Sequence, residues 1–293
     1  MFSNIQIYDL GLFLEKYLLY MIVYPNAKIN LGLNVINKRT DGYHNLNTIF
    51  YPVPLCDAIE FVLANDGVTS FSSSGIPVGG SSEDNLIMKA YHLINRHHKL
   101  PALKIHLHKV IPMGAGLGGG SSDAAFFLST LNSFFNLNLS EEALADMARI
   151  LGADCAFFIY NSPCLATNRG DRFNFLEERL KNKFLIIVKP DVHVSTAEAY
   201  NGVLPFVPAF SNESVYLNEP LVNWEGKMIN DFEKSVFIKF PEIKLVKEKL
   251  YSLGALYASM SGSGSSVFGI FEDEINIDLK LFPTSYFIWK GLL

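Results

Sequence analysis

The most constraining feature of the chain is a glycine-rich segment between two regular patterns. Upstream, residues 104–109 alternate between apolar and polar side chains, which predicts a half-buried strand with His106 and His108 on its polar face. Downstream, apolar residues recur at helical spacing as far as Leu131. Between these patterns lie five closely spaced glycines: Gly114, Gly116, Gly118, Gly119 and Gly120. The sequence therefore predicts a strand, a glycine loop and a helix in succession.

This layout suits an anionic ligand. Glycines let the backbone approach a ligand closely, and the N–H groups at a helix start carry partial positive charge. Ser121 or Ser122 is expected to cap the helix, because a short hydroxyl accepts a hydrogen bond from an unpaired backbone N–H. The net charge is −5, so an anion needs such a local positive field. A plain connecting turn is the alternative, but the density of glycine and serine favours phosphate binding.

Three common phosphate-binding folds do not fit this segment. The chain has no Gly-Lys-Ser/Thr tripeptide, which a P-loop requires. It also lacks the His-Arg-Asp and Asp-Phe-Gly signatures of protein kinases. A Rossmann unit needs a second strand that ends in an acid about 20 residues later, where residues 139–142 instead predict a helix start.

Composition limits the partners and the compartment. The chain has 293 residues, 49% hydrophobic and 18% charged, which suffices for one large or two medium domains. A pI near 5.8 without a basic cluster argues against nucleic acid as a partner. Three cysteines without a CxxC pair indicate reduced thiols in a cytoplasmic protein. Either a monomer or a homodimer is compatible with the sequence.

Residues 1–20 do not have the features of a targeting segment. They carry Asp9 and Glu15 but neither a basic start nor a small-residue cleavage site, so they are not a signal peptide. The longest apolar run, 17–24, is far shorter than a membrane span, so no membrane partner is expected. We predict that the native chain starts at Met21; an added surface helix is the alternative.

Local patterns predict further elements in the N-terminal part. Residues 57–68 are expected to form an edge strand and residues 71–82 a serine-glycine loop. A helix should follow as far as His97, capped by Asp84 or Asn85. Ser140 should cap another helix that ends at Gly152.

The C-terminal part is expected to begin near Lys183 with the buried strand 184–189. Ser195 or Thr196 should cap the next helix, and residues 204–223 should be irregular. We then predict a helical region that begins at 230–233 and a helix at 241–253. Strands are predicted at 256–259 and 267–271, with a second serine-glycine loop at 261–265 between them.

Three segments resemble the signatures of the GHMP kinases in the expected order. Residues 112–125, PMGAGLGGGSSDAA, are similar to the central signature of that family. Residues 25–53 and 258–268 resemble its first and third signatures, and the resemblance extends from about Val23 to Phe271. The resemblance implies an α+β, two-domain fold with its active site in the cleft between the domains. An N-terminal domain like domain 2 of ribosomal protein S5 would span 21–180, and a ferredoxin-like C-terminal domain 181–293.

The same resemblance implies that ATP is a co-substrate and Mg²⁺ a cofactor. The metal would contact Ser121 or Ser122. Asn85 and Lys109 would lie near the adenine. The triphosphate would contact the glycine loop: Pro112, Met113, Gly114, Ala115, Gly116, Leu117, Gly118, Gly119, Gly120, Ser121 and Ser122.

The resemblance also implies the catalytic residues. Asp154 follows the helix end at Gly152, where the helix dipole disfavours an acid, so its presence calls for a reason. By resemblance Asp154 is the catalytic acid, with Lys28 opposite it. Alternation places Lys28 and Asn30 on one strand face, where a lysine that reaches solvent is the ordinary alternative. The chain departs from the family at Ala156, where proline is usual, and at Asn168, where glycine is usual; asparagine tolerates left-handed dihedral angles.

The resemblance extends to the substrate. The Asp-Gly turn before Tyr43 and His44 could be an ordinary hairpin. It resembles an element that recognises cytosine by stacking and hydrogen bonding in those members that phosphorylate a cytidine-diphosphate-linked methylerythritol on the non-mevalonate route to isoprenoids. Asn30, Thr196, Gly262 and Gly264 would also contact substrate. Another GHMP small-molecule kinase and a catalytically silent nucleotide-binding protein are the alternatives.

Overall fold

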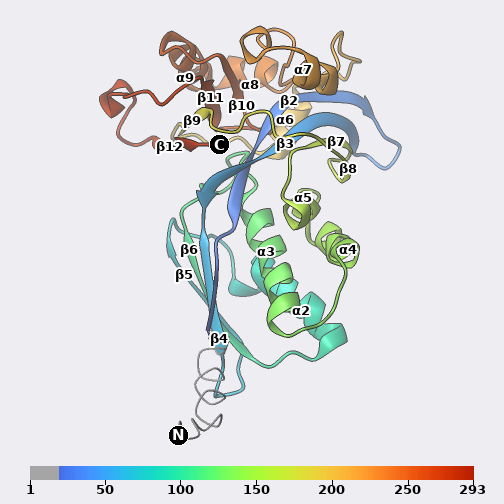
Figure 1. The fold of residues 1–293 in the computed structure, drawn as a ribbon. Helices are drawn as coiled ribbons and strands as arrows, with labels where there is room; N and C mark the ends of the chain where they lie inside the picture. Colours follow the sequence, from blue (N-terminus) through green and yellow to red (C-terminus); the bar gives the residue numbers. More distant parts are fainter. Residues whose placement is uncertain (1–19) are drawn as a thin grey trace, which may run out of the picture.

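The computed structural model describes residues 20–293, which form three four-stranded sheets with helices packed against them (Figure 1). The predictions for segment 1–20 concern residues outside this range, Tyr20 excepted. Within the described range, no helix is both long and apolar enough to cross a membrane.

The first sheet contains β1 (Tyr20–Val23), β4 (Ala58–Leu63), β6 (Leu103–Lys109) and β5 (Ser70–Gly75), in that spatial order. The alternation predicted for β6 is confirmed, because its odd-numbered residues are buried and its even-numbered residues are not. Lys109 at its end is buried, and a Cβ atom on Gly119 would lie 3.0 Å from its Nζ, so this side chain contacts the glycine-rich segment.

Two predictions for this sheet were wrong. β4 is not an edge strand, because β1 pairs antiparallel with its outer side. Residues 71–82 are not only a loop, because β5 pairs in parallel with β6. Serines can occupy this strand because ladder hydrogen bonds use the backbone, and Ser72 and Ser74 place their Oγ atoms 2.9 Å from the two ring nitrogens of His106.

Four helices pack on the first sheet: α2 (Leu86–His98), α3 (Gly119–Phe134), α4 (Glu141–Leu151) and α5 (Cys155–Tyr160). The predicted caps at Asn85 and Ser140 are confirmed. The Asn85 side chain accepts a hydrogen bond from the Ile87 N–H at 2.8 Å, and Ser140 accepts one from the Ala143 N–H at 3.2 Å. These helices bury Phe127, Leu128 and Leu131 of α3 in a shared core.

The second sheet is antiparallel and contains β2 (Asn26–Lys38), β3 (His44–Cys56), β7 (Cys164–Asn168) and β8 (Arg172–Phe175) in sequence order. β2 and β3 form a long hairpin whose turn lies at the predicted Asp-Gly segment. Asn168 has φ = 61°, so the left-handed conformation that the sequence allowed at this position is confirmed.

The third sheet has the order β10 (Tyr257–Met260), β11 (Val267–Phe271), β9 (Phe184–Lys189) and β12 (Phe287–Leu292), all antiparallel. The remaining helices are α6 (Thr196–Asn201), α7 (Asn212–Asn218), α8 (Glu233–Lys239) and α9 (Pro241–Ser252). Ser195 caps α6 as predicted. The prediction that 204–223 is irregular was wrong for α7, because Ser211 caps a short helix there and Tyr216 anchors it in the core.

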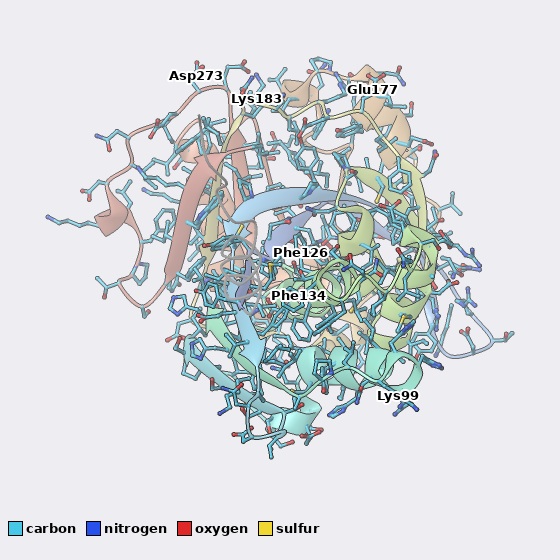
Figure 2. The ribbon with its side chains drawn as sticks, turned by 60° about the horizontal axis from the view of Figure 1, so that its bottom comes forward. Lys99, Phe126, Phe134, Glu177, Lys183 and Asp273 are labelled. Carbon is cyan, nitrogen blue, oxygen red and sulfur yellow. The ribbon has the colours of Figure 1, made fainter. Side chains whose placement is uncertain are left out.

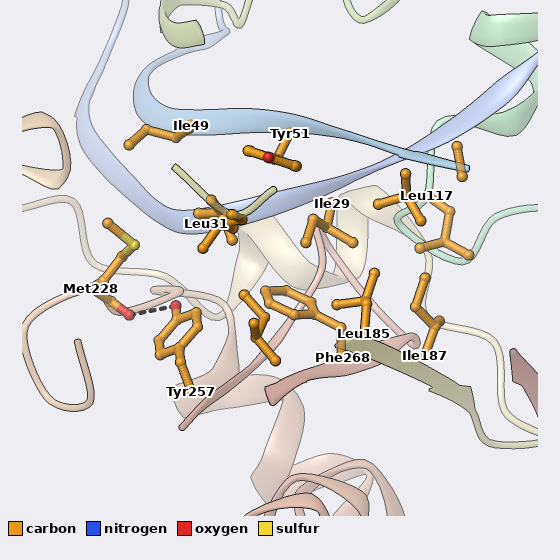
Figure 3. Close-up of a cluster of buried hydrophobic side chains, with 14 of the residues drawn as sticks. Ile29, Leu31, Ile49, Tyr51, Leu117, Leu185, Ile187, Met228, Tyr257 and Phe268 are labelled. Carbon is orange, nitrogen blue, oxygen red and sulfur yellow. Dashed lines mark hydrogen bonds between the residues drawn. The ribbon is translucent and has the colours of Figure 1, made fainter. Parts of the chain in front are cut away.

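Apolar side chains join the second and third sheets (Figure 3). Ile29 and Leu31 of β2 share a core with Leu185 of β9 and Phe268 of β11. The Tyr257 hydroxyl donates a hydrogen bond to the Met228 carbonyl at 2.8 Å. The charged side chains labelled in Figure 2, by contrast, lie toward the outside of the molecule: Lys99, Glu177, Lys183 and Asp273. The apolar face of β2 therefore fixes the strand, and its alternate residues Lys28 and Asn30 are directed to the opposite side.

Candidate active site

The glycine loop connects β6 to α3 and lines a cavity of about 570 Å³, here called the glycine-loop cavity. Gly114, Gly116 and Gly118 have φ values of 59°, 79° and 72°, which favour glycine. The prediction that a serine caps α3 was wrong. The helix begins at Gly119, with Gly118 at the cap position and no side-chain cap, so its first N–H groups remain available to a ligand.

The second serine-glycine loop lies against the first. The Ser261 hydroxyl donates a hydrogen bond to the Gly116 carbonyl at 2.8 Å. A Cβ atom on Gly116 would lie 1.9 Å from the Ser261 carbonyl oxygen, so no larger residue fits there. Gly262 lines the cavity, whereas Gly264 packs against Met260, where a Cβ would lie 2.6 Å from its sulfur.

The residues predicted to contact ATP differ in where they point. Pro112, Met113 and Ser121 line the glycine-loop cavity. Ser122 is fully buried and its Oγ has no hydrogen-bond partner. Leu117 belongs to the apolar core, and its carbonyl accepts a hydrogen bond from the Lys28 N–H at 2.9 Å. Of these two serines, Ser121 lines the cavity and Ser122 does not.

Asp154 and Lys28 face each other in this cavity. Lys28 Nζ lies 3.5 Å from Asp154 Oδ2 and donates a hydrogen bond to Asn30 Oδ1 at 2.6 Å. Burial lowers the pKa of Lys28, and the negative charge of Asp154 opposes this shift. The Lys28 side chain is 3% exposed and that of Asp154 37% exposed, so the carboxylate is accessible while the ammonium is enclosed.

The expectation that Asp154 opposes a helix dipole needs correction. Asp154 comes after α4, but it also directly precedes α5, which begins at Cys155. Its side chain makes no capping hydrogen bond. The carboxylate is therefore placed by the turn between two helices and remains free to contact a ligand.

A second cavity of about 720 Å³ adjoins the first and is here called the hairpin cavity. Tyr43 and His44 line it, and Asp154, Thr196 and Tyr200 line both cavities. His44 and Tyr200 are stacked with ring centroids 4.8 Å apart. Burial, with Lys38 as a second cause, lowers the pKa of His44. The glycine loop, the Asp154–Lys28 pair and the Tyr43–His44 hairpin thus form one continuous site.

Two residues of the hairpin cavity were not found from the sequence. Tyr200 lies four residues after Thr196, one helical turn along α6, and this spacing could have indicated it. Arg169 lies on the β7–β8 turn, and its guanidinium carbon is 5.1 Å from the centroid of the Tyr43 ring. Its contact with Tyr43 joins residues far apart in the chain, so no local pattern could indicate it.

Lys109 is part of a buried ionic cluster that sequence analysis missed. Its Nζ lies 2.5 Å from Asp57 Oδ2 and 2.6 Å from Asp123 Oδ2. Burial raises the pKa of Asp123 to about 7, although Lys109 opposes the shift. Asn85 and Lys109 both line a small cavity of about 140 Å³ next to Met113 and Gly120 of the glycine loop. The two residues predicted near the adenine are therefore close together.

The histidines of β6 belong to no candidate metal-binding group in the part of the chain that the structure describes. No group of three or more His, Cys, Asp or Glu side chains with suitable geometry occurs among residues 20–293. His106 and His108 instead lie within hydrogen-bonding distance of the Ser74 hydroxyl. The three cysteines are free thiols, of which Cys155 and Cys164 are buried.

Two domain families match the chain. The family described as GHMP kinases N terminal domain matches residues 85–162, which include the glycine loop and Asp154. The family described as GHMP kinases C terminal matches residues 207–279, which include the second serine-glycine loop. Together the two matches include both glycine loops of the site and Asp154, whereas Lys28, Tyr43 and His44 lie outside them.

Curated relatives are similar over nearly the whole chain. A 4-diphosphocytidyl-2-C-methyl-D-erythritol kinase of Parabacteroides distasonis is 49% identical, covering 93% of this chain and 100% of the relative. The Bacteroides fragilis protein of that name is 51% identical, with 91% and 97% covered.

Solved structures have the same fold. A crystal structure of 4-(cytidine 5'-diphospho)-2C-methyl-D-erythritol kinase matches with a TM-score of 0.74 and 34% identity, covering 86% of this chain and 91% of that one. The mevalonate kinase of Methanococcus jannaschii matches with a TM-score of 0.69 at 14% identity, covering 94% and 98%, which shows the fold alone. The predicted two-domain α+β fold is therefore confirmed. The chain belongs to the GHMP kinases and, within them, to the family of the 4-diphosphocytidyl-2-C-methyl-D-erythritol kinases.

Proposed function

We propose that the protein transfers the terminal phosphoryl group of ATP to the 2-hydroxyl group of 4-diphosphocytidyl-2-C-methyl-D-erythritol, on the non-mevalonate route to isoprenoid precursors. The observation that carries the proposal is the position of the Lys28–Asp154 pair, in a cavity lined by the glycine loop and continuous with the Tyr43–His44 hairpin. One site thus offers a phosphate cradle, a base and a surface for a nucleobase. The relatives named above carry this activity in their names.

In the proposed reaction, Asp154 orients the attacking hydroxyl group and accepts its proton. The hydroxyl oxygen forms a bond to the γ-phosphorus as the bond from that phosphorus to the β-phosphate oxygen breaks, and ADP leaves. Positioning and charge neutralisation dominate such transfers. Lys28 stabilises the negative charge at this point, and its bond to Asn30 fixes the direction of its ammonium group.

The site fits ATP and Mg²⁺. The free N–H groups at the start of α3 and the left-handed glycines form a cradle for phosphates. Mg²⁺ usually takes one or two protein oxygens together with substrate phosphates, and Ser121 and Asp154 both offer oxygens to the cavity. The bound ion would neutralise charge on the phosphates.

The properties of Tyr43 and His44 favour a cytidyl substrate over other acceptors. Tyr43 is 57% exposed, so its ring is available for stacking on a base. His44 supplies a ring nitrogen for hydrogen bonding, and Thr196 lies where both cavities meet. An acceptor without a nucleobase would make no stacking contact with this aromatic hairpin.

ADP release in a coupled assay tests the proposal, with homoserine and mevalonate as control acceptors. We expect turnover on the cytidyl substrate alone. Turnover on a control acceptor would support kinase activity but reject the cytidyl compound as the specific acceptor. ATP binding without ADP formed on any acceptor would favour a silent nucleotide-binding protein.

A further inference from the structure

The turn between β7 and β8 lies against the hairpin that carries Tyr43. The guanidinium of Arg169 covers one face of the Tyr43 ring at 5.1 Å, and no aromatic side chain among the described residues stacks on Tyr43. Arg169 is 41% exposed, so its side chain needs a partner to hold it over the ring. That partner is Asp171, whose Oδ2 lies 3.3 Å from Arg169 Nη2.

Asn168 connects the β7–β8 turn to the β2–β3 turn. Its Nδ2 donates to Asp171 Oδ1 at 2.6 Å, and its Oδ1 accepts a hydrogen bond from Arg39 Nη1. Arg39 in turn binds Asp41 through Nε and Nη2, and Asp41 Oδ1 accepts from the Tyr43 N–H at 3.1 Å. Burial alone would raise the pKa of Asp171, but hydrogen bonds from Asn168 and Arg169 leave it below its ordinary value. A continuous chain of polar contacts therefore joins Arg169 to the backbone of Tyr43.

The same turn also passes the catalytic acid. Gly170 has φ = 88°, and a Cβ atom there would lie 3.8 Å from Asp154 Oδ1. The residue before Gly170 thus contacts the base-binding ring, while Gly170 itself lies beside Asp154. Displacement of this turn would therefore change the contact of Arg169 with Tyr43 and the surroundings of Asp154.

We propose that Asn168 and Asp171 hold Arg169 over one face of Tyr43, so that Tyr43 presents its other face to the nucleobase of the substrate in a fixed orientation. Arg169 is then a positioning residue that determines specificity for a nucleobase-bearing acceptor, and the asparagine at 168 provides contacts that glycine lacks. The inference rests on the proposed function.

The arrangement of Asn168 and Asp171 that holds Arg169 over Tyr43 is here called the clamp. Substitution of Asn168 tests it with little change to the backbone. Glycine accepts φ = 61° but removes both side-chain hydrogen bonds, so N168G isolates the side chain. We expect the KM for the cytidyl substrate to rise about two- to fivefold, the size of an exposed cation–π contact, with kcat and the KM for ATP unchanged. Asn182 has φ = 66° on an exposed turn and lines neither cavity, so N182G is the matched control, with no expected change in KM.

A double-mutant cycle distinguishes positioning from direct contact. R169L should raise the KM for the cytidyl substrate as N168G does, and R169K should restore part of the loss because the cation stays over the ring. In a Y43L background, R169L should add no further increase, because Arg169 acts through Tyr43. Additive effects of Y43L and R169L, or an unchanged KM in R169L, would overturn the inference.

Failure of the proposed function is separable from failure of the clamp. If the unmodified protein does not phosphorylate the cytidyl substrate, the proposed function is rejected. Binding of CDP, measured by calorimetry on the same variants, then tests the clamp without turnover. CDP affinity that is equal in N168G, R169L and the unmodified protein would reject the clamp in either case.

Discussion

Lys28 Nζ lies 3.5 Å from Asp154 Oδ2, and the two side chains differ sharply in exposure. Lys28 belongs to β2, which begins 128 positions before Asp154 in the chain. The ammonium is enclosed by Asn30 and the ring of Phe50, whereas the carboxylate is accessible from both cavities. A buried charge beside an accessible acid is typical of a reaction site, because burial strengthens the electrostatic interaction between them.

Replacement of Asp154 by asparagine should remove the proton acceptor and preserve the shape of the site. We expect kcat to fall about 10²- to 10⁴-fold, the usual contribution of a general base, with the KM for ATP within about twofold of that of the unmodified protein. Steady-state kinetics of D154N would show this. Turnover close to normal would reject Asp154 as the base.

Replacement of Lys28 by methionine should separate activity from stability. We expect kcat to fall about 10²- to 10³-fold, as for removal of one electrostatic contact to the transition state. Because burial lowers the pKa of Lys28, the unfolded chain holds this proton to higher pH than the folded protein. The cost of the buried charge is therefore full below the folded pKa and disappears as pH rises through the ordinary lysine value.

K28M should accordingly unfold at a higher temperature than the unmodified protein near neutral pH, and this advantage should shrink at alkaline pH. Thermal unfolding followed by circular dichroism across pH 7 to 10 measures it. A lower unfolding temperature for K28M at neutral pH would show that the charge of Lys28 stabilises the fold.

Gly116 should not tolerate a side chain, because its Cβ would collide with the Ser261 carbonyl. We expect G116A to lose about 1–3 kcal/mol of unfolding free energy, as for overpacking, and to bind ATP more weakly. Gly226 has a similar φ of 74° but open space around it, so G226A carries the backbone strain without the collision. Equal losses of stability in the two variants would indicate that the contact between the loops is unimportant.

The buried cluster around Lys109 predicts a pH dependence of stability. Burial raises the pKa of Asp123 to about 7, so the folded protein holds a proton that the unfolded chain releases near pH 4. Between these values the folded state binds more protons, and the contribution of Asp123 to stability falls as pH rises from about 4 to 7. In D123N this decline should be absent from urea unfolding at pH 5 to 8, and a retained decline would assign it to another group.

Part of the site could be predicted because it depends on local patterns. The glycine spacing indicated the loop, the hydroxyl and amide caps at Ser140 and Asn85 indicated helix starts, and strand alternation placed Lys28 beside Asn30. The prediction that a serine caps α3 was wrong, because Gly118 occupies the cap position in the left-handed conformation.

Contacts between distant parts of the chain explain what the sequence did not reveal. Asp57 and Asp123 approach Lys109 because β4, β6 and α3 pack together, and this packing depends on the whole sheet. Likewise, His44 contacts Tyr200 because α6 lies beside the β2–β3 hairpin. Such pairs are specified by tertiary packing, which local periodicity does not reveal.

Phosphorus NMR of the reaction product tests the central claim most directly. With the unmodified protein, ATP and 4-diphosphocytidyl-2-C-methyl-D-erythritol, we predict a new phosphomonoester signal that grows in proportion to ADP, while the diphosphate signals of the cytidyl group persist. ADP that forms together with inorganic phosphate, without a new ester, would show ATP hydrolysis and contradict phosphoryl transfer to this substrate.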